Sequence, residues 1–121
     1  MEIFKQFKFE AAHWLPGVPE GHKCRRMHGH SYRVKVVVRG EPDEKTGMVL
    51  DFAELTRVCG PVIDGLDHRV LNEIEGLENP TAELLAMWIW ERVEGLVPGL
   101  VRVEVLETAN SGVVYEGPER R

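Results

Sequence analysis

The spacing of the apolar residues changes along this 121-residue chain, and the order of those changes constrains the fold more than any other feature. Apolar and polar residues alternate near both ends, as in half-buried strands, whereas apolar residues recur every three or four positions in the middle, as in helices. The predicted elements are strands 3–13 and 32–38, helices 52–66 and 81–96, and strands 101–106 and 113–116. This order predicts an α+β fold, with a four-stranded antiparallel sheet carrying both helices on one face.

Capping and helix-breaking residues mark the ends of the two predicted helices. Asp51 is suited to cap the first helix, and either Asn79 or Thr81 is suited to cap the second. Gly60 and Pro61 fall inside the first helical pattern, where proline removes a backbone hydrogen bond, so we expect a kink or an interruption there.

The length and composition favour one small intracellular domain, residues 1–121. The longest unbroken apolar run, 84–90, is far shorter than the ~20 residues that a spanning helix needs, so we expect no membrane segment. The first ten residues carry charges and do not resemble a signal peptide. Two cysteines are too few for a secreted disulfide scaffold, and we therefore expect a cytoplasmic protein.

The charges are distributed unevenly. The chain has 15 basic and 20 acidic residues, a net charge of −5 that argues against a nucleic-acid partner. Residues 21–39 nevertheless contain no acid and six basic side chains, at Lys23, Arg25, Arg26, Arg33, Lys35 and Arg39. This basic segment suits a small anionic ligand, or it is simply the solvated face of a strand.

The His28-Gly29-His30 sequence is the sharpest local signal. Residues two apart in a strand point to the same face, so both imidazoles can reach one metal ion. His13 ends the first predicted strand on its apolar face, and the three histidines would meet if the two strands pair as a hairpin. Three imidazoles with an open fourth position are typical of catalytic zinc. The alternative is that His28 and His30 only bond to backbone at a strand end.

The two cysteines have different surroundings. Cys24 lies four residues before His28 among basic neighbours, which favour the thiolate. It is therefore a candidate nucleophile or proton acceptor, a candidate metal ligand, or an ordinary surface thiol. Cys59 lies on the apolar stripe of the first predicted helix, and we interpret it as a core residue.

Two further sets of residues carry candidate chemistry. Asp67 directly precedes His68, and a carboxylate beside an imidazole can orient it and raise its pKa. Glu107 continues the apolar face of the third predicted strand, where an unpaired charge is costly, so we expect a partner for it. That partner is a protein group, or a ligand edge with two adjacent N–H donors, such as a pterin or guanine.

Together these residues resemble the 6-pyruvoyl-tetrahydropterin synthase family, and within it the 6-carboxy-tetrahydropterin synthase branch. The resemblance spans residues 7–117, and the three residues between Cys24 and the HGH sequence are similar to the spacing in that branch. Five segments carry it in the family's order: FEAAHWLPGVPEGHKCRRMHGH (9–30), LDFAEL (50–55), LDHRVLN (66–72), GLENPTAELLAMWIW (76–90) and VLET (105–108).

The resemblance implies a role for each matching residue. It implies zinc (Zn²⁺) ligands at His13, His28 and His30, and a catalytic set of Cys24, Asp67 and His68. It also implies that Glu107 anchors the pterin ring and that Thr81 helps to hold it. The implied fold is the tunnelling fold, in which sheets of several subunits form a barrel, commonly a homohexamer of two stacked trimers with active sites at the subunit interfaces.

The resemblance further implies an activity. The chain would be a lyase that converts 7,8-dihydroneopterin triphosphate to 6-carboxy-5,6,7,8-tetrahydropterin, acetaldehyde and triphosphate, on the route to queuosine. Two alternatives stay open. One is a 6-pyruvoyl-tetrahydropterin synthase, with the same site but elimination of triphosphate; the other is a non-catalytic protein that binds zinc and pterin.

Overall fold

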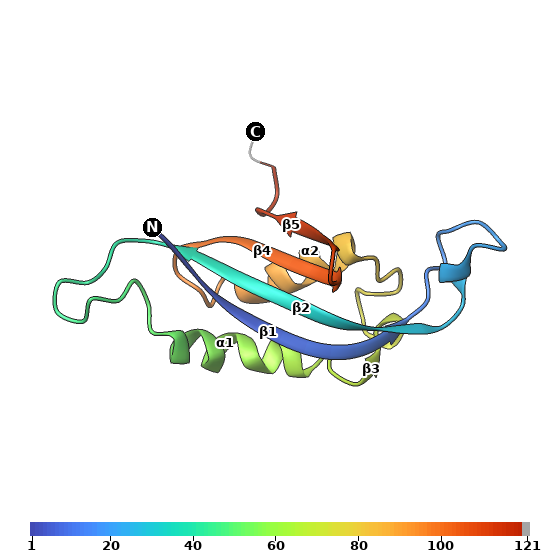
Figure 1. Ribbon diagram of the computed structural model, residues 1–121, viewed down its shortest axis with the longest axis horizontal. Coiled ribbons are helices and arrows are strands. Elements are labelled where there is room, and N and C mark those ends of the chain that lie inside the picture. The colour runs from blue at the N-terminus through green and yellow to red at the C-terminus, as the bar shows by residue number, and fades with distance from the viewer. Residues whose placement is uncertain (120–121) are drawn as a thin grey trace.

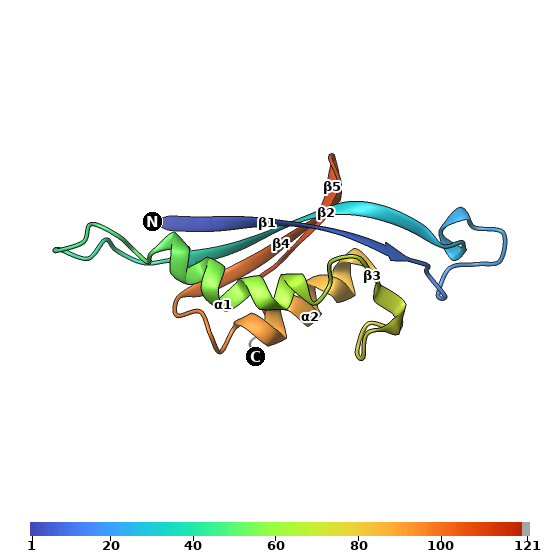
Figure 2. The same cartoon turned by 90° about the horizontal axis from the view of Figure 1, so that it is seen from below.

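The computed structural model describes residues 1–119, which form a five-stranded sheet with both α-helices on one of its faces (Figures 1 and 2). The order of strands across the sheet is β3-β1-β2-β4-β5. The elements in chain order are β1 (Glu2–His13), η1 (Lys23–Arg25), β2 (His28–Arg39), α1 (Phe52–Asp64), β3 (Arg69–Val70), η2 (Leu71–Glu73), α2 (Ala82–Val93), β4 (Leu100–Thr108) and β5 (Ser111–Tyr115).

The predicted α+β class and the placement of the helices are confirmed, but the prediction of four antiparallel strands is wrong in one respect. The additional strand β3 pairs in parallel with β1, opposite Ala11 and Ala12. The sheet is therefore mixed, and the order of elements is ββαβαββ. A two-residue strand is too short to show an alternating pattern, and only its contact with β1 makes it a strand.

The helix caps follow the predicted chemistry. The Asp51 side chain accepts a hydrogen bond from the backbone N–H of Ala53 at 2.8 Å, and the Thr81 hydroxyl accepts one from Leu84 at 3.1 Å. The predicted interruption of the first helix is wrong, because α1 continues past Pro61 to Asp64. Pro61 lies in the last turn, so the helix continues without the hydrogen bond that an N–H at this position would donate to the carbonyl of Arg57. Helix α2 ends at residue 93, three residues before the predicted end.

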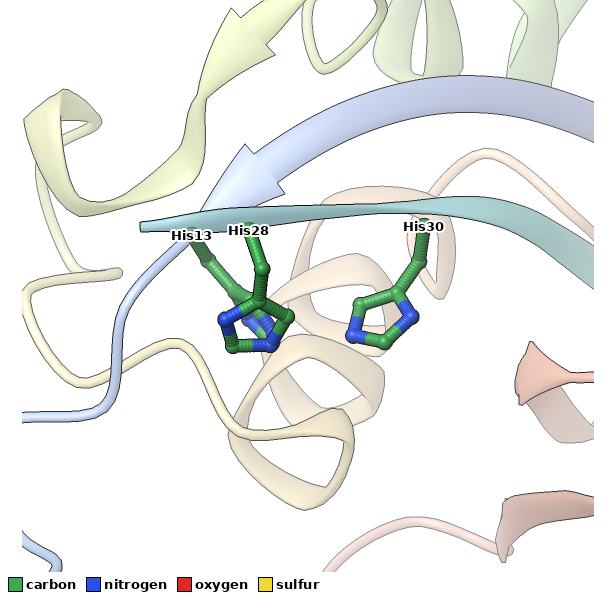
Figure 3. Close-up of side chains that lie close together, drawn as sticks. All are labelled: His13, His28 and His30. Carbon is green, nitrogen blue, oxygen red and sulfur yellow. The ribbon is translucent and has the colours of Figure 1, made fainter. Parts of the chain in front are cut away.

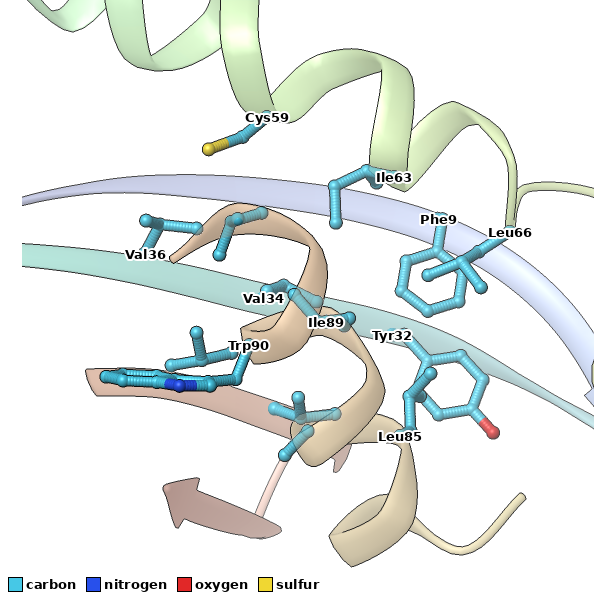
Figure 4. Close-up of a cluster of buried hydrophobic side chains, with 14 of the residues drawn as sticks. Phe9, Tyr32, Val34, Val36, Cys59, Ile63, Leu66, Leu85, Ile89 and Trp90 are labelled. Atoms are coloured by element: carbon cyan, nitrogen blue, oxygen red, sulfur yellow. The ribbon is translucent and has the colours of Figure 1, made fainter. Parts of the chain in front are cut away.

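The core lies between the helices and the covered face of the sheet (Figure 4). Tyr32, Val34 and Val36 of β2 alternate onto this face and are almost completely buried, as the sequence pattern predicted. Cys59 of α1 is a core residue, and burial raises the pKa of its thiol to about 11. Within the described part of the chain, no helix is long and apolar enough to cross a membrane.

The register of the β1–β2 hairpin positions the candidate site. His13 pairs with His28, and Ala11 pairs with His30. All three histidines therefore lie at the same end of the sheet, on the face that also carries Tyr32 and the core. The two strands do pair as the hairpin on which the meeting of the histidines depended.

Gly99 supports a tight entry into β4, and substitution there should destabilise the protein. Its φ is +78°, and an added Cβ would lie 2.7 Å from the carbonyl oxygen of Arg39. We expect Gly99→Ala to lower the free energy of unfolding by about 2–4 kcal/mol, measured by denaturant titration. Gly95→Ala is the matched control, because nothing lies within 4 Å of its Cβ position and its φ is not positive. Equal stability of the two variants would contradict this account of Gly99.

Candidate functional site

Three histidine side chains converge at the end of the β1–β2 hairpin (Figure 3). The Nε2 atoms of His13 and His28 are 3.0 Å apart, and the ligand nitrogens of His13, His28 and His30 all lie within 4.8 Å of one another. His13 is fully buried, whereas the other two are half-buried. Among the residues that the structure describes, this is the one group of His, Cys, Asp or Glu side chains gathered closely enough to hold a metal ion.

Backbone carbonyls orient two of these imidazoles. The Nδ1–H of His13 donates to the carbonyl oxygen of Pro80 at 2.9 Å, and that of His28 donates to Arg26 at 2.7 Å. Such bonds leave the lone pair on each Nε2, and orientation by a carbonyl is usual for metal-binding histidines. Two facing lone pairs repel unless a cation or a proton lies between them. Two nitrogens on one tetrahedral zinc ion lie about 3.3 Å apart, close to the spacing seen here.

The electrostatics of the site also suit a metal ion. Burial lowers the pKa of His13 and of His30, against the opposing effect of the Glu107 carboxylate. Both imidazoles are therefore neutral at neutral pH, which is the form that binds metal. Three imidazole nitrogens suit zinc, and the residues present fit the ion that the sequence predicted.

Glu107 reaches the histidines from β4. Its Oε1 lies 3.4 Å from the Nε2 of His13 and 3.5 Å from that of His30. The pairing of β4 with β5 changes register between residues 106 and 108, so Glu107 lies in a bulge, a feature that re-aims side chains next to active sites. Gly112 faces the bulge, and a Cβ there would be only 2.4 Å from the carbonyl of Val105. Neutral imidazoles with lone pairs at Nε2 cannot donate to this carboxylate, so the expected partner of Glu107 stays a prediction.

Cys24 is held beside the histidines by its backbone. The N–H of Leu15, just after β1, donates to the Cys24 carbonyl at 2.8 Å, and the Cys24 N–H donates to Nδ1 of His22 at 3.0 Å. The thiol lines a pocket of about 440 Å³ together with Leu15, Lys23, His28, His30 and Glu107. The structure thus brings four predicted site residues into one pocket.

Asp67 and His68 form a rigid pair at the edge of the sheet. Asp67 accepts from the backbone N–H of Glu10 at 2.9 Å and from Nδ1 of His68 at 2.9 Å, and these bonds hold the pKa of its carboxyl below the ordinary value. The His68 N–H donates to the Glu10 carbonyl at 2.6 Å, which holds His68 at a φ of +58°. A left-handed non-glycine residue is strained, and such strain is frequent at functional sites.

The structure does not place this pair with Cys24. Asp67 and His68 are absent from the lining of the Cys24 pocket, and His68 lines another cavity, of about 460 Å³. Thr81 is also absent from that lining, and its hydroxyl caps α2. Its neighbour Pro80 is the residue whose carbonyl orients His13.

Three groups at the site were missed by the sequence analysis. The carbonyls of Arg26 and Pro80 have no side-chain signature, so no pattern could have indicated them. The phenol of Tyr32 lies 3.3 Å from Nδ1 of His13. Burial raises the pKa of Tyr32, so the phenol stays protonated. Tyr32 follows His28 and His30 at alternate positions of β2, and this alternation was the signal that could have indicated its place at the site.

The sequence profile described as "6-pyruvoyl tetrahydropterin synthase" matches residues 2–118, nearly the whole chain. The chain belongs to this family. The resemblance predicted from the motifs is therefore confirmed. The solved structure of Caenorhabditis elegans 6-pyruvoyl tetrahydropterin synthase superposes with a TM-score of 0.89, at 30% identity, over 98% of this chain and 96% of that one.

Curated relatives whose names describe different reactions are similar to this chain over almost its full length. The 6-carboxy-5,6,7,8-tetrahydropterin synthase of Synechocystis sp. is 48% identical, over 96% of this chain and 93% of the relative. The dihydroneopterin monophosphate aldolase of Pyrococcus furiosus is 39% identical, over 97% and 90%. Membership of the synthase family therefore leaves the reaction to be decided by the site.

Proposed function

We propose that this chain is a zinc-dependent 6-carboxy-5,6,7,8-tetrahydropterin synthase. Its reaction would convert 7,8-dihydroneopterin triphosphate to 6-carboxy-tetrahydropterin, acetaldehyde and triphosphate. The observation that carries the proposal is the pocket that His28, His30, Cys24 and Glu107 share, with His13 beside the two histidines. The 48% identity to the Synechocystis enzyme of that name supports this branch over the others.

The predicted site residues each have a role in this proposal. The Glu107 carboxylate would accept two N–H bonds from the pterin edge, which directs the substituent at C6 toward the histidines. A zinc ion held by His13, His28 and His30 would act as a Lewis acid toward the side-chain oxygens. Cys24 would accept a proton from the substrate side chain, and His68, oriented by Asp67, would serve as a second acid–base group.

The separation of His68 from Cys24 supports an oligomeric active site. We propose that the Asp67–His68 pair of one subunit completes the Cys24 pocket of its neighbour, in a homohexamer of two stacked trimers. The sheet face opposite the helices is not covered by any described element, and Phe4 on it is 51% exposed. Light scattering coupled to gel filtration would test this assembly, and a monomeric active enzyme would contradict it.

The product identifies the reaction. Zinc-loaded protein is incubated with 7,8-dihydroneopterin triphosphate, and the products are read by mass spectrometry. Carboxy-tetrahydropterin with acetaldehyde is the expected result. A pyruvoyl-tetrahydropterin product would instead show triphosphate elimination, and unchanged substrate with bound zinc would indicate a binding protein.

Replacing Glu107 tests the pterin anchor separately from the metal. Glutamine has nearly the same shape but offers one acceptor atom and no charge, so it cannot accept two adjacent N–H donors. We expect Glu107→Gln to weaken binding of 7,8-dihydroneopterin by about 10- to 100-fold, while zinc content stays unchanged. Fluorescence titration measures the binding of 7,8-dihydroneopterin, and elemental analysis measures the zinc content. Loss of zinc in this variant would show that Glu107 serves the metal rather than the pterin.

A further inference from the structure

One charged residue of the Cys24 pocket has no role in the chemistry described so far. The pocket lining contains one lysine and no arginine, and that lysine is Lys23. The whole chain carries a net charge of −5, which repels anions. A lysine in the same pocket as Cys24 provides a local positive charge that can attract an anionic ligand.

Three other members of the basic segment 21–39 are already engaged elsewhere. The Arg25 guanidinium donates to two backbone carbonyls of its own loop, one of them at 2.8 Å. Arg39 forms an ion pair with Glu2 at 2.6 Å. The ammonium of Lys35 lies over the ring of Phe4, 4.6 Å from its centroid. These three stabilise the loop and the sheet.

The two remaining arginines lie outside the pocket lining. Arg33 alternates with the buried residues Tyr32 and Val34, so it belongs to the opposite face of β2, and it lines a neighbouring cavity of about 350 Å³ with His30 and Glu107. Arg26 contributes only its backbone carbonyl, which accepts from His28. Lys23 is therefore the one cation of this segment that lines the pocket.

The position of Lys23 follows from the bonds that hold the next residue. Lys23 begins the short helix η1, and the side chain of His22 caps this helix. The N–H of Leu15, just after β1, donates to the carbonyl of Cys24 and so ties the helix to the end of that strand. No ion pair involves Lys23 among residues 1–119, and its side chain is exposed at the pocket. The ammonium is thus anchored at its backbone and available to a ligand.

We propose that Lys23 binds the phosphate groups of the substrate and thereby selects phosphorylated over unphosphorylated dihydropterins. This inference rests on the proposed function. With the pterin edge on Glu107 and the side chain beside the histidines, the phosphorylated end of a three-carbon side chain would lie in the same pocket, which Lys23 also lines. Lysine is a compact point charge, which suits a flexible polyphosphate that takes no single geometry.

The test compares two ligands that differ only in phosphate. Dissociation constants of 7,8-dihydroneopterin and its triphosphate are measured by fluorescence on the zinc-loaded full chain, in a Cys24→Ala background that prevents turnover. We expect Lys23→Gln to weaken binding of the triphosphate by about 10- to 100-fold and to change binding of the unphosphorylated pterin by less than about threefold.

Two control variants separate a local contact from a general charge effect. Lys23→Arg keeps the charge and should keep most of the preference for the triphosphate. Lys45→Gln removes the same charge in the 40–50 loop, at the opposite end of the sheet from η1, and should change neither constant (Figure 1). Equal weakening of both ligands by Lys23→Gln, or no weakening of the triphosphate, would overturn the inference.

Failure of the proposed function would appear in a different measurement. Wild-type enzyme would then leave the triphosphate unchanged in the product assay, whatever the binding constants show. A preference for the triphosphate that depends on Lys23 in an inactive protein would still support the phosphate contact. An active enzyme without that dependence would overturn the contact alone.

Discussion

Replacing His28 with alanine should abolish metal binding by the histidine group. His28 supplies one of three imidazoles, and its Nε2 lies 3.0 Å from that of His13, so the variant retains only two ligands. Loss of one outer hydrogen-bond partner already lowers metal affinity by about 10- to 100-fold, and loss of a direct ligand should exceed this. Elemental analysis of the purified variant should find almost no zinc, and turnover should be lost with it.

His22→Ala is the matched control for this prediction. His22 is an exposed histidine in the same loop, and its Nδ1 accepts from a backbone N–H, so it belongs to the capping of η1 and not to the metal group. The control variant should keep its zinc. Full zinc occupancy in His28→Ala would show that His28 is not an essential ligand, and the metal centre would then have to be assigned to other side chains.

Replacing Cys24 with alanine should nearly abolish turnover while leaving zinc and pterin bound. The thiol lines the pocket but is not part of the close histidine group, so its removal takes away a proton acceptor and no metal ligand. Acid–base groups of this kind contribute about 10²- to 10⁴-fold to a rate. Steady-state kinetics should show that loss in kcat, with unchanged zinc content and pterin affinity.

Cys59→Ala is the control within the same chain. Cys59 is completely buried in α1 and its pKa is raised to about 11, so it stays a thiol and takes no part in the chemistry. This variant should keep its activity and lose some stability, because it leaves a small cavity in the core. Near-normal turnover in Cys24→Ala would contradict the assignment of Cys24.

Much of the fold followed from periodicity. The alternation along β2 placed Tyr32, Val34 and Val36 on the covered face, and the helical spacing placed Cys59 in the core. Strand β3 was missed because its two residues become a strand only by pairing with Ala11 and Ala12. Helix α1 passes Pro61, where an interruption was expected, and ends three residues later.

The candidate metal ligands also followed from local pattern. His28 and His30 are two apart in a strand, and His13 ends the strand that pairs with them, so alternation and a hairpin were enough to predict their meeting. Adjacency alone made a contact between Asp67 and His68 possible without predicting it, and the structure shows that contact at 2.9 Å. What adjacency could not predict is that this pair lies apart from Cys24.

The sequence by itself therefore determined the class of the fold, the histidine group and the family, because each depends on residue types at short, regular spacings. Only the tertiary structure decided how those histidines are oriented and which side chains share their pocket. The carbonyl of Pro80 reaches His13 from 67 positions away, and Glu107 arrives on a bulge of another strand. Contacts of this kind depend on packing between distant segments, which no local pattern encodes.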